Sequence, residues 1–271
     1  MVEPVLAVRS LGKSFPIHSG WLRRETSRID AVRDVTWSLA KGETLGLVGE
    51  SGCGKSTLAK LCVGLLSPTA GEVRIAGQHL AGLRGGGVRA ARRIVQMVFQ
   101  DPTTSLNPRM TVGEMLNEPL LIHRLAPGRA ARRRRVAELL ELVQLPAGYA
   151  GRLPRELSGG ERQRVGIARA LAVEPAVLIC DEPVASLDVS VGARILELLR
   201  SLRRRLGMAV LFISHDLGMV ASLCERTAVM REGRLVELAP TEQLLTHPAH
   251  PYTQLLIRAS ALDLDADTSR I

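Results

Sequence analysis

The sequence lacks any apolar run long enough to cross a bilayer as a helix, which takes roughly 18 to 20 residues. Its longest apolar stretches, at 176–180 and 209–213, have the length of buried strands. The first residues also lack the basic flank and the apolar core of a signal peptide. We therefore expect a protein that stays in the cytoplasm and meets a membrane only through a partner.

Cysteine is scarce, and the few cysteines are scattered. None of the paired spacings that bind zinc or iron–sulfur clusters occurs among Cys53, Cys62, Cys180 and Cys224. A cytoplasmic compartment keeps such thiols reduced. We interpret the four side chains as small apolar residues that fill the core.

Lysine is rare although the chain is basic, with a formal net charge of +9 at pH 7. Only four of its 36 basic residues are lysines, and the others are arginines. The positive charge would suit nucleic acid or an acidic membrane surface. Coding bias is the simplest explanation of the preference for arginine. The preference nevertheless makes each remaining lysine informative, Lys55 above all.

Short apolar strands alternate with helical patterns, and this alternation predicts an α/β fold with a mostly parallel sheet. Strands are expected at 44–48, 94–99, 176–180 and 209–213, and helices at 55–66 and 191–206. Before them, the segments 5–8 and 31–39 have the pattern of antiparallel edge strands. A polar, basic loop around 20–30 would join these edge strands.

From about 112 to 157 the pattern becomes mostly helical. In 132–143 one helical face carries the apolar residues Val136, Leu139, Leu140 and Val143. We interpret about 101–159 as a helical subdomain inserted into an α/β core.

A single domain of 1–271 accommodates these parts. The core with its antiparallel edge comprises 1–100 and 160–240, including a short hairpin around Gly233, and a tail with two helical segments follows at 241–271. Consecutive glycines at 85–87 predict a flexible connector.

A glycine-rich loop at 49–56 fits the phosphate-loop pattern G-x-x-x-x-G-K-[ST] between an expected strand and an expected helix. Its backbone N–H groups and the positive end of the helix dipole suit phosphates. Lys55 would supply a compact charge to the β and γ phosphates, and the Ser56 hydroxyl can bind Mg²⁺. We expect nucleotide binding through Gly49, Glu50, Ser51, Gly52, Cys53, Gly54, Lys55, Ser56 and Thr57.

Two carboxylates follow the strand 176–180, at the edge of the sheet where ligands bind in open α/β folds. Asp181 would hold Mg²⁺, and Glu182 would polarise or deprotonate an attacking water. On its own, such an acid pair could equally cap a strand-to-helix turn.

Two further polar residues also follow strands. Gln100 comes after 94–99 and could reach the metal or the water, and His215 comes after 209–213 and could donate to the γ-phosphate. Each alone is more often structural, but strand ends converge on one edge of a sheet, which favours a shared site.

The order of these elements resembles an ATP-binding cassette (ABC) ATPase. The segment Leu157-Ser158-Gly159-Gly160-Glu161-Arg162-Gln163 resembles the signature motif of that family and precedes the acidic strand as it does there. The other matching parts, in family order, are 49–56, Gln100, Asp181-Glu182, Ser186-Leu187-Asp188 and His215. The resemblance runs from about residue 5 to 259.

The resemblance implies a P-loop NTPase core, ATP and Mg²⁺ as cofactors, and two such domains that close face to face on ATP. Phe15 matches the position that stacks on adenine in the family, although a hydrophobic plug on an edge strand is the alternative. The γ-phosphate bound by one subunit would meet the other subunit at Ser158, Gly159, Gly160 and Asp188.

The fifth signature position departs from the family, because Glu161 stands where glutamine is usual. The pattern from Ser158 to Glu161 is also a capping box, which gives the acid a structural reason to be there. Its negative charge near a phosphate would weaken closure somewhat without abolishing it.

Within the family, the chain looks most like the peptide and nickel importer branch. The segments that carry this likeness are Gln100-Asp101-Pro102, 105–109, 188–191 and His247-Pro248-Ala249-His250-Pro251-Tyr252-Thr253. Prolines after both tail histidines predict a stiff turn, and no third ligand is near, so we do not expect a metal there. The tail has no cysteine, so we expect no iron–sulfur cluster.

The resemblance therefore implies the ATP-hydrolysing subunit of an importer of peptides, nickel or metal chelates, at the cytoplasmic face of the membrane. Its expected partners are an identical or similar ATPase, two membrane permeases and an extracytoplasmic binding protein. The helical insertion and the segment after Gln100 would grip a permease helix and turn domain closure into channel motion.

The sequence leaves two other functions open. A soluble ABC ATPase that acts on nucleic acid or ribosomes would explain the charge and the arginine run 132–135, but that run lies on a polar helix face, and the chain has no room for a second cassette. We therefore expect no nucleic-acid partner. A regulatory module without hydrolysis is disfavoured by the presence of Glu182 and His215.

Overall fold

The computed structural model describes residues 3–19, 24–101 and 105–268. The chain divides into two compact units, one formed by Met1–Leu83 with Leu211–Ile271 and the other by Arg84–Val210. None of the helices in the described ranges is both long enough and apolar enough to span a membrane.

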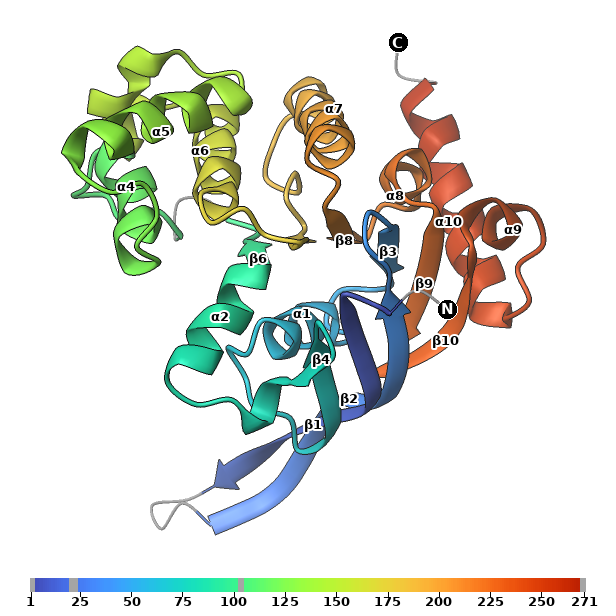
Figure 1. Ribbon diagram of the computed structural model, residues 1–271. Helices are drawn as coiled ribbons and strands as arrows, with labels where there is room; N and C mark the ends of the chain where they lie inside the picture. Colours follow the sequence, from blue (N-terminus) through green and yellow to red (C-terminus); the bar gives the residue numbers. More distant parts are fainter. Residues whose placement is uncertain (1–2, 20–23, 102–104, 269–271) are drawn as a thin grey trace. The chain divides into compact units, whose positions relative to one another are not determined.

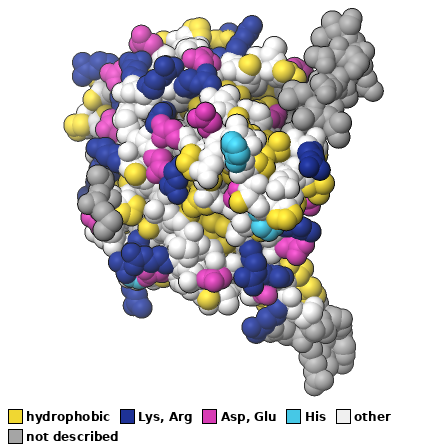
Figure 2. Space-filling model, turned by 90° about the vertical axis from the view of Figure 1, so that its right-hand side faces the viewer, with side chains coloured by type: hydrophobic (Ala, Val, Ile, Leu, Met, Phe, Trp, Pro, Cys, Tyr) yellow, Lys and Arg dark blue, Asp and Glu magenta, His cyan; other side chains and the backbone are white. Residues whose placement is uncertain are grey.

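The cysteines lie where the sequence predicted, in the core, and the basic side chains are spread over the face that Figure 2 shows. All four cysteines are buried, and burial raises the pKa of the Cys62 thiol to about 12, as expected of core-filling residues. On the face shown in Figure 2, basic side chains are dispersed among acidic and apolar ones. The positive charge is thus not gathered into one patch on this face.

The first unit begins with an antiparallel sheet in which β1 and β2 form a long hairpin (Figure 1). Its strands, in the spatial order β2-β1-β4-β5, are β1 (Leu6–Ser19), β2 (Arg24–Leu39), β4 (Ala70–Ile75) and β5 (Gln78–His79). This is the antiparallel edge that the sequence predicted.

The hairpin is longer than predicted, because much of the expected loop around 20–30 is strand. Ile29 lies opposite Phe15, and Asp30 lies opposite Ser14, whose Oγ donates to Asp30 Oδ1 over 2.6 Å. Cross-strand pairs of this kind stabilise a ribbon even where its residues are exposed. Residues 20–23 of the predicted loop lie outside the described ranges.

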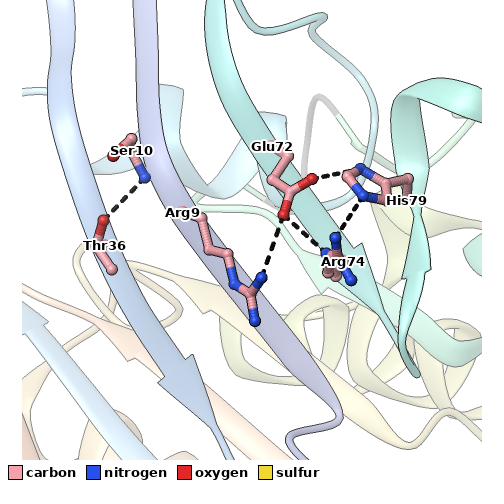
Figure 3. Close-up of polar contacts among 6 residues, drawn as sticks. All are labelled: Arg9, Ser10, Thr36, Glu72, Arg74 and His79. Carbon is pink, nitrogen blue, oxygen red and sulfur yellow. Dashed lines mark hydrogen bonds and ion pairs between the residues drawn. The ribbon is translucent and has the colours of Figure 1, made fainter.

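A polar cluster centred on Glu72 joins β1, β4 and β5 (Figure 3). Oε1 of Glu72 accepts a hydrogen bond from Arg74 Nε over 2.7 Å and lies 3.7 Å from Arg9 Nη1. Oε2 lies 2.5 Å from Nδ1 of His79, whose Nε2 is 2.6 Å from Arg74 Nη2. Because a guanidinium can only donate, the contact between Arg74 and His79 has the guanidinium as donor and Nε2 as acceptor, while Nδ1 faces the carboxylate of Glu72.

The first unit also contains the strand that leads into the glycine-rich loop. β3 (Thr44–Val48) is wholly buried and pairs in parallel with β9 (Arg226–Arg231), which pairs antiparallel with β10 (Arg234–Pro240). The turn between β9 and β10 lies at Gly233, with φ 83°, as predicted. In the chain, β8 (Ala209–Ile213) spans the point where the second unit ends and the first resumes.

The helices of the first unit, in the part of the chain that the structure describes, are α1 (Lys55–Cys62), α8 (Leu217–Leu223), α9 (Thr241–Thr246) and α10 (Pro251–Thr268), with a 3₁₀ turn at Leu80–Gly82. α9 packs on β10, and α10 packs on α8 (Figure 1). α1 is shorter than the predicted 55–66 because Gly64 adopts φ 67°, and a left-handed residue just past the last turn ends a helix.

The second unit is mostly helical. Its elements are α2 (Gly86–Ile94), β6 (Val95–Val98), α4 (Val112–Ile122), α5 (Arg129–Leu142), η2 (Ala147–Gly151), η3 (Pro154–Glu156), α6 (Gly159–Leu171), β7 (Val177–Asp181) and α7 (Val189–Leu206), where η marks a 3₁₀ helix. β6 and β7 pair in parallel. α4, α5 and α6 pack on one another (Figure 1).

Two predictions for this unit have opposite outcomes. α5 buries Val136, Leu139 and Leu140, which confirms the predicted apolar face. The glycines at 85–87 are not a flexible connector, because Gly85 is the N-cap of α2 and the helix continues to Ile94. The burial of Ala91 in α2 shows that packing overrides the low helix propensity of glycine here. The separation of 101–159 from the core remains a prediction.

Candidate functional site

The glycine-rich loop 49–56 connects β3 to α1 and passes close to neighbouring backbone. A Cβ atom added at Gly49 would lie 2.1 Å from Met230 O, and one added at Gly54 would lie 2.1 Å from Ala31 O. Both glycines also have positive φ, 154° and 109°. Only glycine fits at these two positions.

The side chain of Lys55 is folded back into this loop. Its Nζ donates to Gly49 O over 2.6 Å and to Glu50 O over 2.8 Å, and the residue is only 4% exposed. Among the described residues of the first unit, no carboxylate pairs with this ammonium. A buried cation without an anionic partner is costly, so the loop provides a site at which an anion is strongly favoured.

The other side chains of the loop are compatible with an anionic ligand. Burial raises the pKa of the Cys53 thiol, against the opposing effect of Lys55, so the thiol stays neutral. Ser56 and Thr57 follow Lys55 in the first turn of α1, where hydroxyl groups and the helix dipole meet a phosphate in other phosphate loops.

Two hydrogen bonds join the glycine-rich loop to other parts of the first unit. Gly233 N donates to Cys53 O over 3.0 Å, and Glu50 N donates to the hydroxyl of Tyr252 over 3.2 Å. Tyr252 was not among the predicted site residues, because it lies 202 positions further along the chain. The tail motif around it was the only sequence signal that could have indicated it.

Phe15 lies in β1 and is half-buried. Lys13 Nζ lies 5.1 Å from the centroid of its ring, within the range of a cation–π contact. The predicted stacking of adenine on this half-buried ring remains a prediction.

His215 lies at the end of β8, beside the strand that leads into the loop. Ser214 N donates to Leu47 O over 3.2 Å, which places the residue after Ser214 near the carboxyl end of β3. Asp216 then caps α8 by accepting from Met219 N over 2.9 Å. His215 is exposed between these two anchored residues.

In the second unit, the ends of β6 and β7 bring together two of the predicted catalytic side chains. Gln100 Nε2 donates to Glu182 Oε2 over 3.1 Å. Asp181, the last residue of β7, is 4% exposed, and Glu182 has the unusual φ of 47°. The parallel pairing of β6 with β7 explains why residues from these two strand ends meet. Pro102 of the neighbouring motif lies outside the described ranges.

The signature segment begins α6, with Ser158 as the N-cap. Ser158 Oγ accepts from Glu161 N over 3.3 Å, and Glu161 Oε2 accepts from Ser158 N over 2.8 Å, so the predicted capping box is confirmed. An added Cβ at Gly160 would lie 2.5 Å from Val191 Cγ1. Because Gly160 has no side chain, α6 can approach the start of α7. The N-cap of α7 is the exposed Asp188.

The second oxygen of Glu161 has a partner that sequence reasoning missed. The hydroxyl of Tyr149 donates to Glu161 Oε1 over 2.7 Å, and the guanidinium of Arg152 lies 3.8 Å from the centroid of the Tyr149 ring. Both residues come from or adjoin η2. No sequence pattern marks such a contact across a 3₁₀ turn.

The predicted metal ligands offer only oxygen donors: the hydroxyl of Ser56, the carboxylate of Asp181 and the amide oxygen of Gln100. Mg²⁺ typically takes one or two protein oxygens and completes its shell with water and substrate phosphates. The donor chemistry of these residues therefore fits Mg²⁺ held together with a nucleotide.

Family models match two parts of the chain. The ABC transporter model matches residues 32–185. The model of the oligopeptide/dipeptide transporter C-terminal region matches residues 236–269.

Several proteins of known family are similar along most of this chain. The probable peptide ABC transporter ATP-binding protein y4tS of Sinorhizobium fredii is 49% identical over 96% of this chain and 73% of its own length. The oligopeptide transport ATP-binding protein OppF of Bacillus subtilis is 45% identical over 100% of this chain and 87% of its own. The glutathione import ATP-binding protein GsiA of Escherichia coli K12 is 48% identical over 95% of this chain, which spans 41% of the length of GsiA.

Solved structures share the fold. The dimeric ATP-binding cassette MJ0796, in a post-hydrolysis state bound to ADP and Pi, aligns with a TM-score of 0.77 at 31% identity over 87% of this chain and 98% of its own. CbiO1 from Clostridium perfringens, part of the ABC transporter complex cbiONQ, aligns with a TM-score of 0.76 at 26% identity over 96% of this chain and 98% of its own. The predicted α/β fold of the P-loop NTPase type is confirmed.

Proposed function

Because the chain belongs to the ABC transporter family, we propose that it is the ATP-hydrolysing subunit of an importer whose cargo is a peptide. The match of the tail to the oligopeptide/dipeptide transporter C-terminal region supports the peptide cargo. So do the functions in the names of y4tS and OppF. Nickel or a metal chelate stays an alternative cargo.

The observation that carries the ATPase proposal is the environment of Lys55. Its ammonium is buried at the loop and is held by carbonyl oxygens of Gly49 and Glu50. Carbonyl groups orient the cation but do not neutralise it. A triphosphate would supply the missing negative charge, and the loop N–H groups would bind its oxygens.

Hydrolysis would proceed by attack of a water oxygen on the γ-phosphorus and cleavage of the bond to the β–γ bridging oxygen. Glu182 would orient the water and take its proton, and the hydrogen bond from Gln100 would hold the carboxylate in place. His215 would donate to a γ-phosphate oxygen. Mg²⁺, when bound through Ser56, Asp181 and Gln100, would neutralise charge on the phosphates.

The site would be completed by a second ATPase subunit, identical or similar. Stacking on adenine would come from Phe15 of the subunit that holds the nucleotide. The other subunit would offer the α6 N-terminus at Ser158, where a helix dipole and N–H groups favour anions. The contributing residues there would be Ser158, Gly159, Gly160 and Asp188.

The proposed partners beyond this dimer are two permeases and an extracytoplasmic binding protein, with the ATPase on the cytoplasmic face of the membrane. Nucleic acid is not a proposed partner. In the run 132–135, Arg135 is engaged by Glu138 and Glu174, and basic side chains are dispersed on the face in Figure 2. Neither feature resembles a continuous track for a phosphate backbone.

The Glu182→Gln variant tests the proposed site. It keeps the shape of the side chain but cannot take a proton, so ATP should stay bound and hold two copies together. We expect a dimer with trapped nucleotide by size-exclusion chromatography with light scattering. The matched control Lys55→Ala in the same background should remain monomeric. A Glu182→Gln protein that stays monomeric and traps no ATP would refute the proposal.

The cargo is tested separately. Proteins that co-purify with the chain from detergent-solubilised membranes should include permeases. Once these are reconstituted with their binding protein, ATP turnover should rise with a peptide mixture. Stimulation by nickel or a nickel chelate in place of peptide would instead assign a metal cargo.

A further inference from the structure

The tail segment, residues 247–253, has no part in the chemistry proposed above, yet it is anchored to the first unit. The carboxylate of Glu237, on β10, accepts from Ala249 N over 2.9 Å and from His250 N over 3.0 Å. One side chain thus binds two consecutive backbone amides of the tail segment. This fixes the turn between α9 and α10.

His250 fixes the direction of the next residues. Its Nδ1 accepts from Tyr252 N over 3.1 Å, and its carbonyl accepts from Gln254 N over 3.1 Å. The side chain of Gln254 donates back to Pro248 O over 3.1 Å. The start of α10 is therefore set by the two hydrogen bonds that His250 accepts, and the bond from the Gln254 side chain to Pro248 involves neither His250 nor Tyr252.

This arrangement directs the ring of Tyr252 to the phosphate loop. Tyr252 is 3% exposed, and the guanidinium of Arg231 lies 4.9 Å from its ring centroid. Its hydroxyl accepts from Glu50 N over 3.2 Å. Burial raises the pKa of Tyr252, so the hydroxyl is neutral when it accepts this bond.

The contact is made at a sensitive point of the loop. Glu50 N belongs to the second residue of the phosphate loop, and Glu50 O is one of the two carbonyls that hold Lys55. A hydrogen bond at the amide of Glu50 thus restrains the same residue whose carbonyl orients the ammonium. Preorganised N–H groups and charges bind a ligand more tightly because less ordering is left to do on binding.

A phenylalanine at position 252 would fill the space next to the loop equally well. Packing alone therefore does not explain why the residue here carries a hydroxyl group. We propose that Tyr252 is a positioning residue for the phosphate loop, and that through it the tail segment sets the affinity of the loop for a triphosphate. The identity of the triphosphate as ATP rests on the function proposed above. The restraint that Tyr252 places on the loop does not depend on that function.

Tyr252→Phe tests the proposal, since it keeps the ring and removes only the hydroxyl. We expect the KM for ATP in the assembled transporter to rise about two- to tenfold, the worth of one hydrogen bond, with kcat at saturating ATP unchanged. Binding of a fluorescent ATP analogue to the isolated chain should weaken by the same factor. Circular dichroism verifies that the variant is folded.

Gln254→Ala is the matched control. It removes the tail hydrogen bond to Pro248 but not the bond to Glu50, so its KM should equal that of the native chain. An unchanged KM in Tyr252→Phe would overturn the proposal. An equal rise in both variants would also overturn it, because general packing of the tail would then be responsible.

A measurement without nucleotide separates this proposal from the proposed function. Amide hydrogen exchange at Glu50 should be faster in Tyr252→Phe than in the native chain and in Gln254→Ala, whether or not the native chain binds ATP. Equal exchange at Glu50 in all three proteins would refute the positioning role even if ATP turnover is normal.

Discussion

The hydroxyl of Tyr149 donates a hydrogen bond of 2.7 Å to Glu161 Oε1, so both oxygens of the acid in the signature segment are engaged. This bond is the main cause that lowers the pKa of the Glu161 carboxyl, and the amide of Ser158 is the second. The carboxylate is therefore charged, and one of its oxygens is held toward η2. These two hydrogen bonds hold both oxygens of the charged carboxylate in place without cancelling its charge.

Tyr149→Phe should lower ATP turnover by about tenfold, because a hydrogen bond to a charged group is lost and Glu161 Oε1 becomes free to move toward the bound phosphate. ATP turnover by the assembled complex measures the effect. In a Glu161→Gln background the same change should cost less than about twofold, since a neutral amide does not repel phosphate. An equal loss in both backgrounds would show that Tyr149 serves only to stabilise the fold.

The hydrogen bond between Gln100 and Glu182 predicts that removal of the Gln100 amide slows the hydrolysis of bound ATP. Gln100→Leu should lower ATP turnover about a hundredfold, because the carboxylate loses the donor that orients it toward water. Single-turnover hydrolysis, with the protein in excess over ATP, measures this step.

Gln96→Leu is the control for that experiment. Gln96 lies on the same strand, β6, but its side chain bonds to Arg92 O rather than to Glu182. Its turnover should stay within about twofold of the native rate, as expected for a substitution away from the reacting atoms. A normal rate in Gln100→Leu would remove Gln100 from the catalytic group.

Gly160→Ala should destabilise the second unit by about 1–3 kcal/mol, because the new methyl group would collide with Val191 and force α6 and α7 apart. Gly166→Ala in the same helix meets nothing within 4 Å. It should stabilise the unit by about 0.5–1 kcal/mol through helix propensity. Urea unfolding of both variants measures the two signs, and a stable Gly160→Ala would contradict the close approach.

The carboxyl of Glu237 predicts a pH dependence of tail docking. Burial alone would raise its pKa, but the hydrogen bonds from the tail outweigh burial and lower the pKa from the ordinary value of 4.5. A lowered pKa in the folded state adds stability that is full above pH 4.5 and is lost as the pH falls through the folded-state pKa.

The native chain should therefore be more stable than Glu237→Gln at pH 7, and this difference should shrink below pH 4.5. Unfolding free energies of both proteins, measured as a function of pH, provide the comparison. A difference for Glu237→Gln that is constant with pH would contradict the role of the charged carboxylate.

The parts of the fold that could be predicted are those with a local signal. β3 and β8 were predicted to the residue, because each is a buried apolar run. The capping box of Ser158 and Glu161 was also predicted, because both partners lie within one helical turn. The residues that determine where each of these elements begins and ends lie within the element itself, so the local sequence is enough to predict its bounds.

The parts that could not be predicted depend on contacts between distant residues. The outer half of the β1–β2 hairpin is exposed at 27–30, so no apolar alternation indicated it. Tyr149 and Tyr252 act through single hydrogen bonds to Glu161 and to Glu50. Only the folded backbone brings these pairs together, and neither tyrosine stands in a pattern that specifies its partner.

The ammonium of Lys55 is buried and has no carboxylate partner among the described residues of its own unit, and this has a consequence for handling the protein. An anion that binds beside this cation stabilises the folded chain, and the gain in stability grows with the logarithm of the ratio of the anion's concentration to its dissociation constant. At a hundredfold excess the gain is about 2.7 kcal/mol, enough to shift a melting curve by several degrees. The melting temperature, measured as a function of anion concentration, therefore reports binding at the loop. It should order nucleotides, inorganic phosphate and sulfate by their affinity for the loop.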